Sequence, residues 1–127
     1  MKRVVLAIRN RLILEAVTNA LKRAGFFVEK SSSQETERIL TLTNALAATT
    51  LVMDVTRSGD GTFDMRMNTA HEVRRRNPEI KIALLCDKVS DESSAYKVKC
   101  AKEEGAIDAF FYESVPSDYL ADALDAL

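Results

Sequence analysis

Several residue types are scarce in this chain of 127 residues, which contains no tryptophan, one histidine and two cysteines. Cys86 and Cys100 are too few to build a disulfide framework, and they lack the spacing of metal ligands. His71 stands in the middle of a helix-like segment, and no nucleophile is spaced to pair with it. The sequence therefore indicates two buried thiols in a reducing cytoplasm, and it contains no Ser–His–Asp or Cys–His pattern for catalysis.

Glycine is also scarce, and its four positions exclude the common phosphate-binding loops. The turn after the first apolar run, residues 8–11, contains no glycine, so neither a dinucleotide fingerprint nor a P-loop is present. The segment Gly59-Asp60-Gly61 is flexible enough to approach an anion, although a plain turn is the favoured interpretation.

Long hydrophobic runs are absent, since no apolar stretch approaches the ~20 residues that span a bilayer. The N-terminus leads directly into a strand-like segment without the hydrophobic region of a signal peptide. The run Arg74-Arg75-Arg76 is basic, but the net charge is −1 and no aromatic residues are interleaved with it. We therefore expect a cytoplasmic protein that contacts neither a membrane nor, directly, nucleic acid.

The charges present are unevenly distributed along the chain. Residues 1–25 contain six basic side chains against Glu15 alone, whereas residues 103–127 contain seven acids and no lysine or arginine. Such asymmetry can steer partners, but it more often marks two solvated faces of one domain. The length fits a single domain over residues 1–127, either independent or cut from a longer regulator just before a linker.

Apolar runs and helical stripes alternate five times along the sequence. The predicted strands span residues 3–8, 26–29, 50–54, 81–86 and 107–112. The predicted helices span residues 11–24 and 90–104, with a third between Phe63 and Asn77-Pro78 and a last one defined by Leu120, Leu124 and Leu127. A further helix, burying Ile39, Leu42 and Leu46, is predicted to open at the capping-box pattern Ser32-Ser33-Gln34-Glu35. This alternation predicts an α/β protein, a parallel sheet with helices on both faces.

Asp54 follows the apolar run Leu51-Val52-Met53 and precedes a polar loop. A carboxylate there lies at the C-terminal end of a buried strand, which is the edge where open α/β sheets bind ligands. The predicted function therefore depends on whether Asp54 is reactive.

The order of these segments resembles a response-regulator receiver domain of the CheY-like type over essentially the whole chain. The matching pieces are Lys-Arg-Val-Val-Leu near the N-terminus, Leu-Lys-Arg-Ala-Gly-Phe, Leu-Val-Met-Asp, Arg-Asn-Pro-Glu-Ile-Lys-Ile and Glu-Gly-Ala. The resemblance implies a flavodoxin-like (βα)5 fold, a three-layer α/β/α sandwich with sheet order 2-1-3-4-5. It also implies that a histidine kinase phosphorylates an aspartate, which by position is Asp54.

The other working positions of a receiver are altered in this sequence. Ile8 and Arg9 stand where two acids normally help to hold Mg²⁺, and Cys86 with Asp87 replaces a Thr or Ser followed by a small residue. The lysine that ends the fifth strand is replaced by Tyr112 or Glu113, depending on whether one residue is counted as inserted. Losing metal and lysine together should slow phosphoryl transfer greatly, because that reaction depends on positioning and charge neutralisation.

The favoured interpretation is an atypical receiver, a signalling module that is defective in Mg²⁺-dependent phosphorylation and is not an enzyme. Its expected partners are a histidine kinase or an output domain, with a possible homodimer through the fourth and fifth helices, where Tyr96 and Tyr119 place aromatic groups. We expect Arg9 to contact Asp54 directly, and we expect no cofactor. The alternatives are a functional phosphoacceptor, which requires Mg²⁺, and a small flavodoxin-like enzyme or nucleotide binder.

Overall fold

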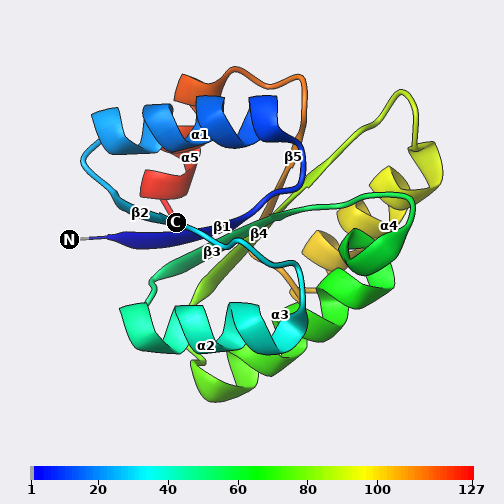
Figure 1. Cartoon of the computed structure of the whole chain (residues 1–127). Coiled ribbons are helices and arrows are strands. Elements are labelled where there is room, and N and C mark those ends of the chain that lie inside the picture. The colour runs from blue at the N-terminus through cyan, green and yellow to red at the C-terminus, as the bar shows by residue number, and fades with distance from the viewer. Residues whose placement is uncertain (1) are drawn as a thin grey trace.

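The structure is a computed structural model, and it describes residues 2–127. Five strands alternate with five helices in it (Figure 1). The strands are β1 (Arg3–Ala7), β2 (Phe27–Lys30), β3 (Thr50–Asp54), β4 (Lys81–Cys86) and β5 (Ala109–Tyr112). The helices are α1 (Arg11–Arg23), α2 (Thr36–Leu46), α3 (Phe63–Arg76), α4 (Glu92–Glu103) and α5 (Ser117–Asp125), with a short 3₁₀ turn, η1, at Gly59–Gly61.

The strands form one parallel sheet in the order β2-β1-β3-β4-β5, as the sequence and its resemblance predict. The central strand β3 pairs Val52 with Leu6 of β1 and with Ala83 of β4. All five residues of β3 are buried, because helices cover both faces of the sheet. The strand therefore places Asp54 at its C-terminal end inside the protein, not on its surface.

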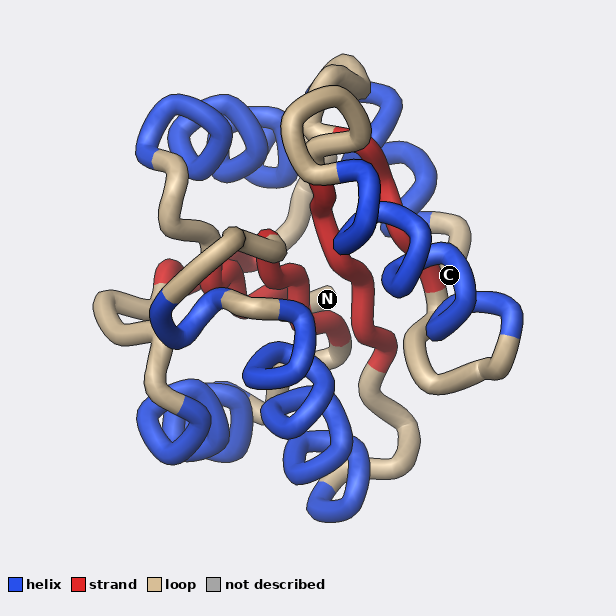
Figure 2. The backbone as a smooth tube through the Cα atoms, turned by 90° about the vertical axis from the view of Figure 1, so that its right-hand side faces the viewer, coloured by secondary structure: helices blue, strands red, loops and turns tan. Residues whose placement is uncertain are grey.

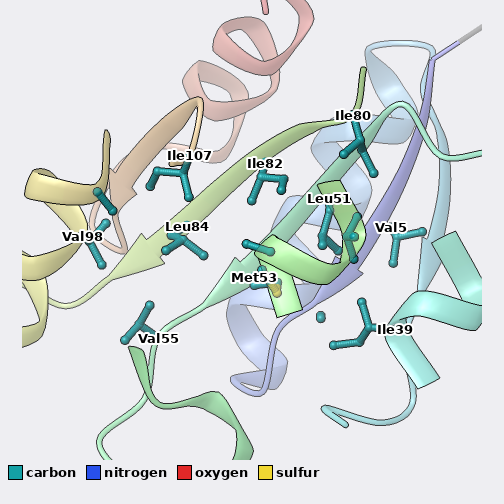
Figure 3. Close-up of a cluster of buried hydrophobic side chains, with 14 of the residues drawn as sticks. Val5, Ile39, Leu51, Met53, Val55, Ile80, Ile82, Leu84, Val98 and Ile107 are labelled. Atoms are coloured by element: carbon teal, nitrogen blue, oxygen red, sulfur yellow. The ribbon is translucent and has the colours of Figure 1, made fainter. Parts of the chain in front are cut away.

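The helices form two layers around the sheet. Figure 1 shows α1 and α5 side by side on one face, and α2, α3 and α4 on the other. One hydrophobic cluster lies beneath each layer, and alternate residues of β1, β3, β4 and β5 point into one or the other, whereas β2 contributes only Val28. Figure 3 shows part of the larger cluster, in which Val5, Met53 and Leu84 from three neighbouring strands meet Ile39 of α2 and Val98 of α4.

Several element boundaries differ from the sequence predictions. Helix α2 begins at Thr36, without a capping box, because Ser31 donates its hydroxyl to Ser33 O (2.6 Å) and Ser33 Oγ accepts the Glu35 amide (3.1 Å). These serines close a turn before the helix instead of capping it. Leu127, predicted to be part of the last helical stripe, lies beyond α5 and is exposed.

The uneven charge distribution is partly neutralised within one layer of the fold. The basic α1 packs against the acidic α5, and Arg23 forms an ion pair with Asp118 at 3.0 Å. Lys2 similarly pairs with Asp125. The two oppositely charged ends of the sequence thus lie beside each other, so part of the asymmetry is used within the domain.

The C-terminal ends of the strands meet at one edge of the sheet, on the right-hand side of Figure 1. Figure 2 looks toward that edge, where loops lead from the red strands to the blue helices. Ligand sites of open α/β sheets occupy this position.

None of the helices within residues 2–127 combines the length and the apolar character of a membrane span.

Candidate functional site

Asp54 ends β3, as predicted, and its main chain pairs with Leu85 of β4. The residue is 1% exposed. Its Oδ2 atom accepts main-chain N–H groups of Arg9 (3.0 Å) and Asn10 (3.4 Å), from the segment that joins β1 to α1. Its Oδ1 atom accepts from Nη2 of Arg66 at 2.9 Å. Both carboxylate oxygens are therefore occupied by donors of the protein itself.

Arg9 contacts Asp54 through its main chain, and the expected pairing of its guanidinium group with the carboxylate is wrong. The Arg9 side chain turns outward over the loop after β3, where its Nη1 atom donates to Ser58 O at 3.3 Å. Gly59 adopts φ +78, and a Cβ atom there would come within 2.7 Å of Arg9 Nη1. The left-handed backbone of Gly59 favours glycine, and the Arg9 side chain lies over this loop and not on the carboxylate.

Arg66 is the cation that pairs with Asp54, and the sequence reasoning missed it. Its side chain is 0% exposed, and it reaches from α3 beneath the C-terminal ends of β1 and β3. Nε donates to Asp54 O (2.7 Å), and Nη2 also donates to Ala7 O (3.0 Å) and to Oε1 of Gln34 (2.6 Å). One guanidinium group therefore links two strands, the β2–α2 loop and the site aspartate.

Burial dominates the electrostatics of this pair. Burial lowers the pKa of the Arg66 guanidinium, and the charge of Asp54 and its hydrogen bond oppose that change. Nη1 of Arg66 is buried without a hydrogen-bond partner among the described residues. Leaving a buried donor unpaired costs about 1–3 kcal/mol, so the network around Asp54 is strong but incompletely satisfied.

The predicted pocket residue Glu113 lies beside Asp54. Both line a hollow of about 240 Å³ at the C-terminal edge of the sheet, together with Asp87 and Asn10. Burial, then the charges of Asp54 and Asp87, raise the pKa of Glu113. Of Tyr112 and Glu113, the two candidates for the position of the receiver lysine, only Glu113 lines the hollow, so a carboxylate stands where the resemblance predicts a cation.

Asp87 is engaged in a turn that precedes α4. Its Oδ1 atom accepts the amides of Val89 (3.0 Å) and Ser90 (3.1 Å), and Oδ2 accepts the Ser90 hydroxyl. Hydrogen bonds from Ser90 are the main cause that lowers the pKa of Asp87. This turn also explains why α4 begins at Glu92 and not at Ser90, as its N-terminus is capped by Asp91.

The remaining predicted pocket residues do not line the hollow beside Asp54. Ile8 is buried in the core under α1, and Tyr112 packs edge-to-face on Phe110 with 5.7 Å between ring centroids. The Lys88 Nζ atom lies 5.2 Å from the Tyr112 ring centroid. Cys86 is buried at the end of β4, and burial followed by the charge of Glu113 raises the pKa of its thiol to about 11.

The carboxylates near Asp54 do not converge on one point. Among residues 2–127 no group of three or more His, Cys, Asp or Glu side chains is arranged to hold a metal ion. The carboxylate oxygens of Asp54 and Asp87 accept hydrogen bonds from donors of the protein. The N–H groups around Asp54 stabilise its own ionised carboxylate. The donor set at this edge therefore does not fit Mg²⁺, which demands several oxygen ligands in near-octahedral geometry.

No protein-family model matches the sequence, and no curated protein is significantly similar to it. Solved structures match it closely in fold. A response regulator from Thermotoga maritima has a TM-score of 0.76 at 18% identity, covering 99% of this chain and 96% of that one. TrrA, a response regulator protein of the same organism in complex with Mg(2+)-BeF, has a TM-score of 0.74 at 20% identity, covering 99% and 98%.

A third similar structure represents a family of redox sensors in the streptococci that evolved from two-component response regulators. Its TM-score is 0.78 at 17% identity, and the match covers 99% of this chain and 50% of that one. Together these likenesses show that the chain has the CheY-like fold of response-regulator receiver domains. The fold predicted from the resemblance is thereby confirmed.

Proposed function

We propose that this chain is an atypical receiver module of two-component signalling, in which Asp54 is held by Arg66 and is not an ordinary Mg²⁺-dependent phosphoryl acceptor. One observation carries the proposal, the buried ion pair of 2.9 Å between the two side chains. The module acts in the cytoplasm through contacts with a histidine kinase or an output domain, and it is not an enzyme. Residues 1–127 form one such domain.

The bound state of Asp54 supports this proposal. A phosphoryl acceptor needs one carboxylate oxygen free to attack in line, with cations nearby to neutralise the charge that arrives. Arg66 occupies Oδ1, and two main-chain amides occupy Oδ2. The partly buried Glu113 adds a negative charge beside the site, which opposes an incoming phosphoryl group.

The energetics also favour an aspartate that stays in place. Removing one member of a buried ion pair typically costs about 3–5 kcal/mol, because the other charge is left uncompensated. Freeing Asp54 for chemistry requires Arg66 to lose a partner while its other hydrogen bonds keep it in the core. The pair therefore stabilises the resting geometry of the strand ends.

The second candidate function is a working phosphoacceptor, and the position of Asp54 favours it. The residue lines a hollow at the end of the central strand, in a fold shared with TrrA, whose structure is a complex with Mg(2+)-BeF. A small flavodoxin-like enzyme or nucleotide binder remains the less favoured alternative, because the strand ends lack a phosphate loop and a catalytic pair.

The face formed by α4, β5 and α5 is the proposed partner or homodimer surface. Tyr96 on α4 and Tyr119 on α5 are 68% and 62% exposed. A hollow of about 330 Å³ lies on this face. It is lined by Tyr119 together with Phe110, Phe111 and Tyr112 of the half-buried edge strand β5. Exposed aromatic groups around an apolar hollow are features of protein-binding surfaces.

Phosphorylation by a small phosphodonor tests the proposal. We expect the intact mass of the protein to be unchanged after incubation with acetyl phosphate and Mg²⁺, because Asp54 is bound and Glu113 repels the donor. The Asp54→Asn variant provides the baseline for reaction at other sites. A stoichiometric gain of one phosphoryl group, abolished by Asp54→Asn, would refute the proposal and establish the second candidate.

A further inference from the structure

A second hollow at the C-terminal edge of the sheet has a character opposite to that of the site at Asp54. It has a volume of about 590 Å³ and lies between the β1–α1 and β2–α2 connections. Three basic residues line it, Arg9, Arg11 and Lys30, against the single acid Glu15. We call it the basic groove, and its volume lies within the range of small-molecule sites, roughly 300–1,000 Å³.

The positive charges of the basic groove are mostly uncompensated. Neither Arg9 nor Arg11 forms an ion pair with a carboxylate within residues 2–127. Lys30 pairs with Glu15 at 3.5 Å, and both side chains are substantially exposed, so that pair contributes little. A chain with an overall charge of −1 thus concentrates an excess of positive charge in one concave surface.

Neutral hydrogen-bonding groups lie beside these charges. Ser32 and Gln34 line the basic groove from the β2–α2 loop. Gln34 uses Oε1 to accept the hydrogen bond from Arg66, and its amide NH₂ group donates to no acceptor among the described residues. Guanidinium groups, an ammonium group and neutral donors together form the set that binds the oxygens of a phosphate group.

We propose that the basic groove binds a small molecule through its phosphate group, and that Gln34 connects occupancy of the groove to Asp54. The connection is structural, since Gln34 lines the groove and its side chain holds the same Arg66 Nη2 atom that holds Asp54. A ligand that moves Gln34 therefore changes the hydrogen bonding of Arg66. Binding in the groove does not depend on whether Asp54 accepts a phosphoryl group.

Amide NMR of the whole chain tests the site, with inorganic pyrophosphate as the probe and sodium chloride at matched ionic strength as the reference. We expect saturable shifts at Arg9, Arg11, Ser32 and Gln34 with pyrophosphate alone. The double substitution Arg9→Gln with Arg11→Gln should weaken binding at least about tenfold, because two positive charges at the groove are lost.

Arg38→Gln is the matched control, since Arg38 is an exposed arginine of α2 that does not line the groove. Its effect should stay below about twofold, as expected for a solvent-screened charge outside the groove. A response that does not saturate by about 10 mM pyrophosphate would overturn the site, because binding weaker than millimolar provides less than ~4 kcal/mol. Equal weakening by Arg38→Gln and by the double substitution would also overturn it, as it would reveal attraction without a defined site.

The Nε–H signal of Arg66 tests the connection to Asp54, because that group donates to Asp54 O and is buried. We expect pyrophosphate to shift this signal in the native sequence and to leave it in place in Gln34→Ala, while the Arg11 amide responds in both. An Arg66 signal that never moves during saturation would refute the connection. The outcome at Asp54 in the acetyl phosphate experiment is independent of both results.

Discussion

Arg66 and Asp54 form a buried ion pair, with side chains that are 0% and 2% exposed. Arg66 lies on α3 and Asp54 at the end of β3, so the pair fixes a helix to the central strand. The same guanidinium group bonds Ala7 of β1 and Gln34 of the β2–α2 loop. Asp54, at the end of the central strand, is thus part of a structural network.

Glu113 should make stability depend on pH in a defined direction. Its pKa is raised in the folded protein, so the folded state binds a proton more readily than the unfolded chain. Its favourable contribution is therefore present at low pH and is lost as the pH rises through the folded pKa. We expect Glu113→Gln to raise the free energy of unfolding at neutral pH, by less than about 1 kcal/mol because the group is partly exposed.

Thermal unfolding across a pH series measures this effect. The gain from Glu113→Gln should shrink as the pH falls into the ordinary carboxyl range, where Glu113 is protonated in both states. Glu79→Gln, at an exposed position, is the control for the loss of one acidic charge. A variant that is less stable than the parent at neutral pH would mean that Glu113 has a favourable partner.

Mg²⁺ should not bind at Asp54. Both carboxylate oxygens of Asp54 accept protein N–H groups, and both oxygens of Asp87 are closed into its own turn, so neither of these two side chains is free to bind the ion. Titration with millimolar Mg²⁺, followed through the amides of Asp54, Val55 and Asp87, measures this. A saturable shift confined to those amides would show that the carboxylates rearrange into a metal site.

Thiol labelling should separate the two cysteines. Burial raises the pKa of Cys86 to about 11 from 9.0, which lowers its thiolate fraction about 100-fold at neutral pH. Cys100 on α4 is only partly buried. We expect iodoacetamide to label Cys100 in the folded protein and Cys86 only after unfolding, as read by peptide mapping. Comparable rates at the two positions in the folded protein would contradict the buried environment of Cys86.

Charge placed on the α4–β5–α5 face should weaken self-association or partner binding. Tyr96→Glu and Tyr119→Glu each put a carboxylate on an exposed aromatic position without disturbing the core. Leu12→Glu, at an 83% exposed residue of α1, is the control on another face. Size-exclusion chromatography and binding to the cognate kinase or output domain give the readout. If all three variants behave alike, the face is not the interface.

The sequence located the five strands to within two residues at each end, and the position of Asp54, because most of these strands appear as continuous apolar runs. It failed where tertiary contacts override local patterns. The residues 32–35 carry a capping-box pattern, yet Gln34 is drawn to Arg66 and the serines close a turn, so α2 starts at Thr36. Local propensity cannot anticipate a partner that lies 32 residues away.

Arg66 was missed for a related reason. Charged residues are rarely buried unless they are paired, and the buried stripe of this helix was assigned from its apolar residues alone. The available signal was its spacing, three residues after Phe63 and four before Ala70, on the stripe that faces the sheet. The sequence singled out the carboxylate of Asp54 but suggested Arg9 as its partner. Only the packing of α3 against the sheet shows that Arg66, and not the Arg9 side chain, pairs with it.

A double-mutant cycle on the buried pair tests the central claim most directly. The free energy of unfolding would be measured by chemical denaturation for the parent, Asp54→Asn, Arg66→Met and the double variant. Each single substitution should cost about 3–5 kcal/mol, since each leaves one buried group without its partner. The double variant should cost less than the sum by at least about 2 kcal/mol, which is the coupling expected of residues in direct contact. Additivity within about 0.5 kcal/mol would contradict the account, because it would mean that Arg66 does not hold Asp54.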